Sequence, residues 1–245
     1  TGAVRHDFLP YQEWLDSNRI SSKYLRMIDD DHTAQAYITT DLDDNQITAF
    51  HPGAMNHSHL LEVPGDEGIK IGILAPDGRE GMLVHAEQLA RAGIPFIFDP
   101  GQALPLFGGQ DIEAFIDQAA WVTVNDYEAQ LLQDRTGLST RDLAARVKAY
   151  VVTRGPEGSL IHADGRTIEV PAVRAAQVVD PTGCGDAYRA GMLYGLMRGI
   201  DWETTGRIAS LMGSIKIASV GTQHHQLAPG EFKERFHAAF QYRLD

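Results

Sequence analysis

The chain has little cysteine, no long apolar run and no excess of positive charge. Among its 245 residues only Cys184 is a cysteine, which excludes an intrachain disulfide and favours a reducing compartment such as the cytoplasm. No apolar run is long enough to span a membrane, and no signal-peptide pattern is present. The net charge of −12 argues against a nucleic-acid-binding surface. We therefore expect a cytoplasmic protein that binds small molecules and has no nucleic-acid or membrane partner.

The composition is otherwise that of an ordinary globular protein, with 43% hydrophobic and 22% charged residues. A chain of this length can bury a sizeable core. It has no internal repeat and no low-complexity linker, so we expect one domain over residues 1–245. The first residues, Thr1-Gly2-Ala3-Val4, resemble the end of a strand and lack an initiator methionine. They predict that the chain begins inside a fold whose earlier part is missing here.

From residue 69 onward, apolar strands alternate with amphipathic helices. Strands are expected at 69–74, 94–98, 121–124 and 150–153, and helices at 78–92, 112–119 and 143–148. A hairpin at 159–162 and 167–170 follows, and later helices are expected at 202–220 and 231–242. The alternation predicts a parallel sheet with right-handed crossovers, whose ligands bind beyond the carboxyl ends of the strands.

The segment before residue 69 has a different pattern. It predicts a helix at 8–20 and a hairpin with strands at 33–40 and 46–50. The acids of the turn between these strands (Asp41, Asp43 and Asp44) indicate a solvated turn rather than a metal-binding loop. The histidine-rich stretch at 51–59 lacks a cysteine partner and an H-x-x-x-H pattern, so its histidines are interpreted as loop residues rather than zinc ligands.

Residues 178–191 hold the most informative pattern in the chain. Val178-Val179 predicts the end of an apolar strand, and a Gly-x-Gly turn then leads into a helix. The peptide N–H groups of Gly183, Cys184 and Gly185 fall at the helix start, where they have no intrahelical partner and the helix dipole favours an anion. Asp186 stands in the same first turn. As an isolated motif it would be interpreted as a capping acid.

The full string at 180–191, Asp-Pro-Thr-Gly-Cys-Gly-Asp-Ala-Tyr-Arg-Ala-Gly, closely resembles the C-terminal signature of the ribokinase-like (PfkB-type) carbohydrate and nucleoside kinases. The resemblance implies a three-layer α/β/α fold with a mostly parallel sheet and a small β lid, for which the hairpin at 33–51 is the candidate. It implies that Asp186 is the catalytic base and that the amides of Gly183, Cys184 and Gly185 form the anion hole. A Walker A loop is absent from the sequence.

The same resemblance implies a set of nucleotide- and metal-binding residues. ATP would be bound by Asn125, Thr153, Gly155, Gly158 and Gly221. Mg²⁺ would be held through water by Glu128, although Asn125-x-x-Glu128 is also a common helix-capping pattern. Asp180 and Thr182 lie where several members of the family bind a monovalent cation, so K⁺ is a further candidate at that place.

The implied reaction is phosphorylation by ATP of a primary hydroxyl on a ribose-containing compound. Stretches 33–55, 77–81 and 98–102 resemble bacterial members described as adenosine-kinase-like, so adenosine or another nucleoside is the first choice of acceptor. Ribose or another sugar is the alternative. A catalytically silent ligand-binding relative or an inactive fragment is a further alternative, which the intact Gly-x-Gly-Asp opposes. A homodimer formed through the lid would also agree with the resemblance.

Overall fold

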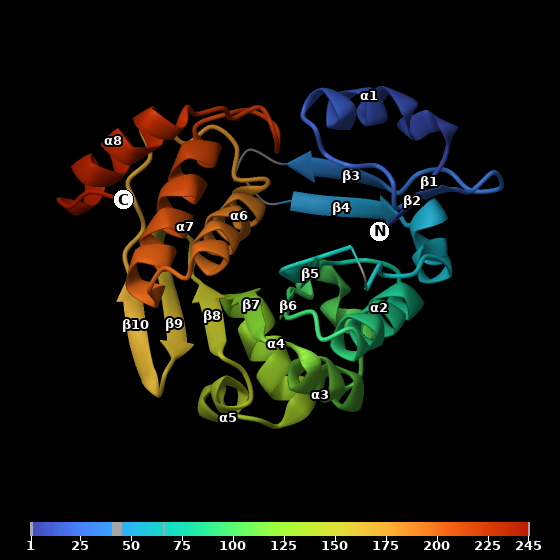
Figure 1. Cartoon of the computed structure of the whole chain (residues 1–245), viewed down its shortest axis with the longest axis horizontal. Coiled ribbons are helices and arrows are strands. Elements are labelled where there is room, and N and C mark those ends of the chain that lie inside the picture. The colour runs from blue at the N-terminus through green and yellow to red at the C-terminus, as the bar shows by residue number, and fades with distance from the viewer. Residues whose placement is uncertain (1, 41–45, 66, 245) are drawn as a thin grey trace.

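A six-stranded mixed sheet lies at the centre of the molecule (Figure 1). The computed structural model describes residues 2–40, 46–65 and 67–244. The strand order is β10-β9-β8-β7-β6-β5, in which β5 to β8 run parallel and β9 and β10 are antiparallel to their neighbours. The strands are β5 (Gly72–Leu74), β6 (Phe96–Phe98), β7 (Trp121–Asn125), β8 (Ala149–Thr153), β9 (Ser159–Ala163) and β10 (Arg166–Val170). The mostly parallel α/β sheet predicted from the sequence is confirmed.

Helices cover both faces of this sheet, because the strands bury side chains on both sides. In β6, Phe96 and Phe98 belong to one core cluster and Ile97 to the other. The first face carries α2 (Arg79–Arg91), α3 (Gly109–Gln118), α4 (Asp126–Thr136) and α5 (Thr140–Ala145). The second face carries α6 (Cys184–Arg198) and α7 (Trp202–Ile217), and α8 (Pro229–Phe240) packs on α7. Phe236 of α8 is fully buried.

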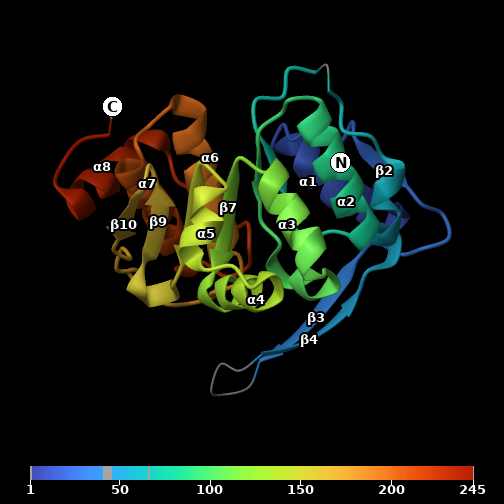
Figure 2. The same ribbon diagram turned by 90° about the horizontal axis from the view of Figure 1, so that it is seen from below.

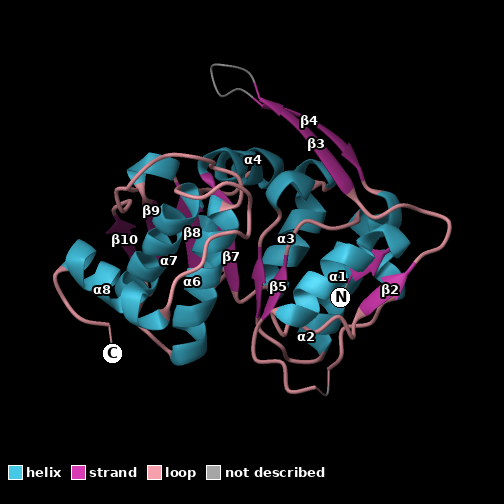
Figure 3. Cartoon of the chain, turned by 90° about the horizontal axis from the view of Figure 1, so that it is seen from above, coloured by secondary structure: helices cyan, strands magenta, loops and turns pink. Residues whose placement is uncertain are grey.

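The N-terminal segment forms a separate unit beside the sheet. Two short strands, β1 (Gly2–Val4) and β2 (Leu25–Met27), pair in parallel around a single turn η1 (His6–Phe8) and α1 (Leu9–Ser17). The predicted hairpin is present as β3 (Gln35–Thr40) and β4 (Gln46–His51), and it projects away from the body (Figures 2 and 3). The predicted solvated turn at Asp41, Asp43 and Asp44 lies outside the described residues.

Three local predictions were wrong. Val178 and Val179 do not end a strand: they lie in the exposed loop between β10 and α6, where the Val179 N–H donates to the Ile217 carbonyl at 2.9 Å. The first parallel strand begins at Gly72 rather than residue 69, because only Gly72–Leu74 finds a partner in β6. The histidine-rich stretch contains a 3₁₀ helix, η2 (Gly53–Leu60), rather than a loop.

Two further 3₁₀ segments, η3 (Gly101–Leu106) and η4 (Gly155–Glu157), follow β6 and β8 directly. Both therefore lie at the carboxyl ends of parallel strands, where ligands of such sheets bind. Across residues 2–40, 46–65 and 67–244, no helix has the length and apolar character needed to cross a membrane.

Candidate active site

The polar residues that follow the parallel strands meet at one edge of the sheet. Asp99 follows β6, Asn125 ends β7 and Thr153 ends β8, with Asn125 and Thr153 paired directly across the ladder. The first half of α6 approaches the same edge, since its Arg189 forms an ion pair with Asp99. The fold thus brings the signature turn to the strand ends.

The turn that starts α6 depends on glycine. Gly183 is the N-cap residue and has φ of 85°, a left-handed conformation that glycine adopts without strain. A Cβ at this position would lie 3.1 Å from the Cβ of Thr222, so the turn packs closely on the loop after α7. The Cys184 N–H donates to the Pro181 carbonyl at 3.1 Å, which engages one of the three amides predicted for the anion hole.

Asp186 lies in the first turn of α6 with its side chain exposed. An exposed carboxylate is open to a ligand at the strand ends, and a helix N-terminus favours a bound anion. The guanidinium of Arg189 lies against the α-carbon of Gly185, within the same turn of the helix. The start of α6 therefore combines an exposed carboxylate, backbone amides and an arginine.

Asp99 and Arg189 are residues that the sequence analysis did not single out. They form an ion pair across 90 positions of the chain, and Asp99 is only 3% exposed. Burial raises the pKa of Asp99 to about 6; Arg189 opposes this, and the charges of Glu128 and Asp186 add to it. Asp99 is thus paired with Arg189 and also acted on by the charges of two other carboxylates. The sequence held one signal that could have singled out Asp99: like Asn125, it comes at the end of a buried strand.

Asn125 and Glu128 form the capping box that was the alternative interpretation of their motif. The Glu128 N–H donates to Asn125 Oδ1, and the Asn125 N–H donates to Glu128 Oε2, both at 2.8 Å. Glu128 is nearly buried, and its charge acts on Asp99. Capping engages one carboxylate oxygen, so the second remains chemically suited to accept a hydrogen bond from water on a metal ion.

The glycines predicted to border the nucleotide occupy positions that require glycine. Gly155 has φ of 53° and Gly158 has φ of 86°, and a Cβ at Gly158 would overlap the Val170 carbonyl. Thr153 donates through its hydroxyl to the Val124 carbonyl at 3.3 Å. The neighbouring Arg154 pairs with Glu169 at 2.9 Å.

Asp180 joins the signature turn to the glycine loop after α7. Its Oδ1 accepts from the Thr182 N–H at 2.9 Å, and its Oδ2 accepts from the Gly221 N–H at 2.8 Å. These bonds hold the pKa of Asp180 below its usual value. The structure therefore brings together Asp180, Thr182 and Gly221, which the sequence analysis had assigned to two different ligands.

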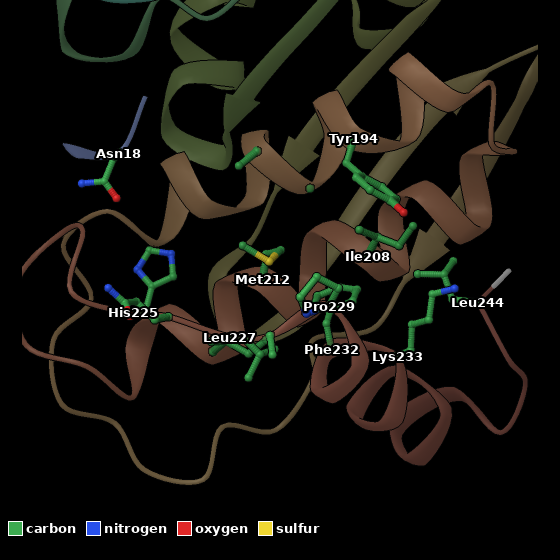
Figure 4. Close-up of a pocket in the computed structure, with 15 residues that line it drawn as sticks. Asn18, Tyr194, Ile208, Met212, His225, Leu227, Pro229, Phe232, Lys233 and Leu244 are labelled. Carbon is green, nitrogen blue, oxygen red and sulfur yellow. The ribbon is translucent and has the colours of Figure 1, made fainter. Parts of the chain in front are cut away.

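A groove of about 890 Å³ lies among α6, α7, α8 and the 225–229 segment (Figure 4). Its walls include Tyr194, Met212, Leu227 and Phe232. Of the described residues that line it, none is a predicted site residue. The groove is therefore separate from the strand-end site. The part of the chain that the structure describes also holds no cluster of three or more metal-ligating side chains.

A doubly covered parallel sheet with a carboxylate and a helix N-terminus at the strand ends is an arrangement that suits a small-molecule phosphotransferase. Comparison with known proteins agrees. The family model described as pfkB family carbohydrate kinase matches residues 7–228. The chain therefore belongs to the pfkB family of carbohydrate kinases, and it is a carbohydrate or nucleoside kinase, as the signature at 180–191 predicted.

The chain is similar to several nucleoside kinases. It is 33% identical over 213 residues to the nucleoside kinase of Methanocaldococcus jannaschii, covering 87% of this chain and 70% of that protein. It is 32% identical over 246 residues to the nucleoside kinase of Methanothermobacter thermautotrophicus, covering 98% of this chain and 79% of that protein. The structure of Burkholderia thailandensis nucleoside kinase in complex with inosine matches with a TM-score of 0.97 and 50% identity, over 100% of this chain and 82% of that one.

Proposed function

We propose that this protein transfers the terminal phosphoryl group of ATP to the primary hydroxyl of a nucleoside, with adenosine as the first choice of acceptor. The observation that carries the proposal is the exposed Asp186 carboxylate in the first turn of α6, beside the strand-end carboxylates. The 50% identity to a nucleoside kinase described in complex with inosine, and in another structure with ADP-inosine, supports a nucleoside acceptor and ATP as donor. The intact Gly183-Cys184-Gly185-Asp186 supports a working enzyme rather than a silent relative.

Each residue at the helix start has a distinct part in this reaction. Asp186 accepts the proton of the acceptor hydroxyl as that oxygen attacks phosphorus. The amides of the Gly183–Gly185 turn and the positive end of α6 stabilise the negative charge on the transferring group. Arg189, held by Asp99, adds a positive charge against Gly185. The glycines at 155, 158 and 221, together with Asn125 and Thr153, are proposed to border the ATP.

Mg²⁺ is proposed to bind through its water shell to Glu128. One oxygen of the Glu128 carboxylate accepts the capping bond from Asn125, and the other is suited to a hard cation that keeps several waters. When bound, Mg²⁺ would neutralise charge on the ATP phosphates. K⁺ at Asp180 and Thr182 was the further candidate of the sequence analysis, and the side chain of Lys216 contacts Asp180.

Replacing Glu128 with glutamine is expected to raise the Mg²⁺ concentration for half-maximal activity by ~10-fold or more, because loss of a group that orients metal-bound ligands commonly has this effect. Glutamine also serves at the third position of a capping box, so α4 should keep its start. The measurement is a Mg²⁺ titration of the initial rate. Asp142→Asn is the matched control, since Asp142 has the same capping position in α5. An unchanged Mg²⁺ requirement in Glu128→Gln would leave Glu128 with a capping role alone.

The choice between nucleoside and simple sugar is tested by competition. We expect kcat/KM of the full-length protein for adenosine to exceed that for ribose by about tenfold or more, because covering an aromatic base contributes over 1.4 kcal/mol. The assay supplies ATP with equal concentrations of adenosine and ribose and separates the two phosphorylated products; inosine replaces adenosine in a second run. A product that is mostly ribose phosphate would reject the nucleoside acceptor and leave the kinase assignment intact.

The β3–β4 hairpin is proposed to be the lid of the acceptor site. It pairs in register over residues 35–40 and 46–51, and it leaves Tyr37, Ile38, Ile47 and Phe50 exposed. Exposed apolar side chains on a projecting hairpin are suited to close over an apolar base. The homodimer through this lid stays a prediction, which sedimentation of the purified protein would test.

A further inference from the structure

Lys216 is a lysine whose side chain is completely removed from water. It lies near the end of α7 and is 0% exposed. Its Nζ donates to the carbonyl of Asp180 at 2.7 Å and to the carbonyl of Ser219 at 3.3 Å. The nearest carboxylate oxygen, Asp180 Oδ2, lies 3.8 Å away. A buried ammonium is costly unless such partners compensate it, so this cluster of oxygens forms a cation site.

The two carbonyls belong to the two loops that form the turn at the start of α6. Asp180 leads into Gly183, whereas Ser219 precedes Gly221 and Thr222. The same loops are joined by the bond from the Gly221 N–H to Asp180 and by the packing of Gly183 on Thr222. The Lys216 ammonium therefore lies at the junction of the loops that set the position of Gly183.

The ammonium also acts electrostatically on the anion-binding turn. Burial raises the pKa of the Cys184 thiol, and the positive charge of Lys216 opposes that rise. Cys184 is the first residue of α6 and belongs to the turn proposed to bind the transferring phosphate, although its own N–H donates to the Pro181 carbonyl. The charge of the buried Lys216 thus acts on the turn that starts α6.

These oxygens are of the kind that bind a monovalent cation. Backbone carbonyls replace the hydration shell of K⁺ in proteins, and a carboxylate adds the compensating charge. K⁺ at Asp180 would have to share the Asp180 and Ser219 oxygens with an ammonium of the same charge. In a buried site such like-charge repulsion is weakly screened. With Lys216 in place, the residues present do not fit a bound K⁺.

We propose that the Lys216 ammonium is a built-in substitute for a monovalent cation in this kinase. It is a positioning residue: it holds the 180–183 loop and the 219–222 loop together and thereby orients the amides at the start of α6. The enzyme then needs no K⁺. The kinetic part of this inference rests on the proposed function.

The wild-type protein supplies the first test. Initial rates are measured in KCl, NaCl and tetramethylammonium chloride at equal ionic strength, the last cation being too large for a carbonyl site. We expect the three rates to agree within about twofold, since a twofold change in rate corresponds to well under 1 kcal/mol. A tenfold or greater stimulation by K⁺ would overturn the proposal.

Two variants supply the second test. Lys216→Ala removes the ammonium and leaves space, whereas Lys216→Met removes the charge and fills the space with a side chain of similar length. In tetramethylammonium chloride both should lose ~10²-fold in kcat, the effect expected of a misplaced catalytic group. We expect added K⁺ or NH₄⁺ to raise the kcat of Lys216→Ala at least about tenfold and to leave the kcat of Lys216→Met unchanged. Equal responses of the two variants would indicate a packing role alone and contradict the proposal.

Thermal unfolding supplies a readout that does not depend on activity. A cation that binds only the folded protein raises Tm with its concentration. Added K⁺ or NH₄⁺, compared with tetramethylammonium at equal ionic strength, should therefore raise the Tm of Lys216→Ala and leave those of Lys216→Met and the wild type unchanged. If the wild type phosphorylated no nucleoside, the proposed function would fail and the Tm series would still decide the role of Lys216. A Tm of Lys216→Ala that does not change with the added cation would overturn the proposal for Lys216.

Discussion

Replacing Asp186 with asparagine is expected to lower kcat by ~10²-fold or more while nucleotide binding and Tm stay close to wild type. A positioned general base contributes at least this factor to a proton transfer. Asparagine has nearly the same shape and cannot accept the proton. Asp186 is exposed in the first turn of α6, so the substitution leaves no buried group without a partner. The measurement is a coupled assay of ADP release with the nucleoside acceptor.

The matched control for this experiment is Asp201→Asn. Asp201 caps α7 by accepting from the Thr204 N–H at 2.9 Å, a role that asparagine also fills. It follows the far end of α6, a helix of 15 residues and thus roughly 22 Å from the start where Asp186 stands. We expect kcat of Asp201→Asn to be unchanged. A kcat of Asp186→Asn near the wild-type value would remove Asp186 from the role of base.

The second large effect is expected at the buried ion pair behind the site. Arg189→Met should lower the free energy of unfolding by about 3–5 kcal/mol at pH 7.5, because it leaves the Asp99 carboxylate buried without its partner. Arg198→Met on the same helix is the matched control. Arg198 is exposed and stacks over Tyr194, so its loss should cost less than about 1 kcal/mol. Denaturant unfolding measures both.

The loss in free energy of unfolding caused by Arg189→Met should depend on pH in a definite direction. Burial raises the folded-state pKa of Asp99 to about 6, above its ordinary value, and removing Arg189 would raise it further. Below about pH 6 the folded variant can protonate Asp99 and so avoid the unpaired charge. The loss in stability should therefore grow as the pH rises through about 6 and shrink as it falls. A loss that is equal at pH 5 and pH 8 would contradict the assignment of a buried charge to Asp99.

Strand prediction succeeded where the pattern was fully local. The predicted strands at 121–124 and 150–153 agree with β7 and β8 to within one residue at each end, because both are short apolar runs buried on both faces. The helix expected at 143–148 instead spans Thr140–Ala145, since Ser139 and Asp142 form a capping box that starts it earlier. Val178-Val179 has the composition of a strand and yet pairs with no strand, because its neighbour is the end of α7.

The sequence by itself determined the family, the sheet and the place of Asp186, because each depends on a contiguous pattern. Glycine at 183 and 185, the acid at 186 and the helix after them form one turn, whose backbone geometry follows from residues next to one another. Only the tertiary structure paired Asp99 with Arg189 and buried Lys216 against Asp180, which lie 90 and 36 positions apart. Such contacts depend on how the strands and helices are packed, and their energies come from burial, which no local pattern of residues specifies.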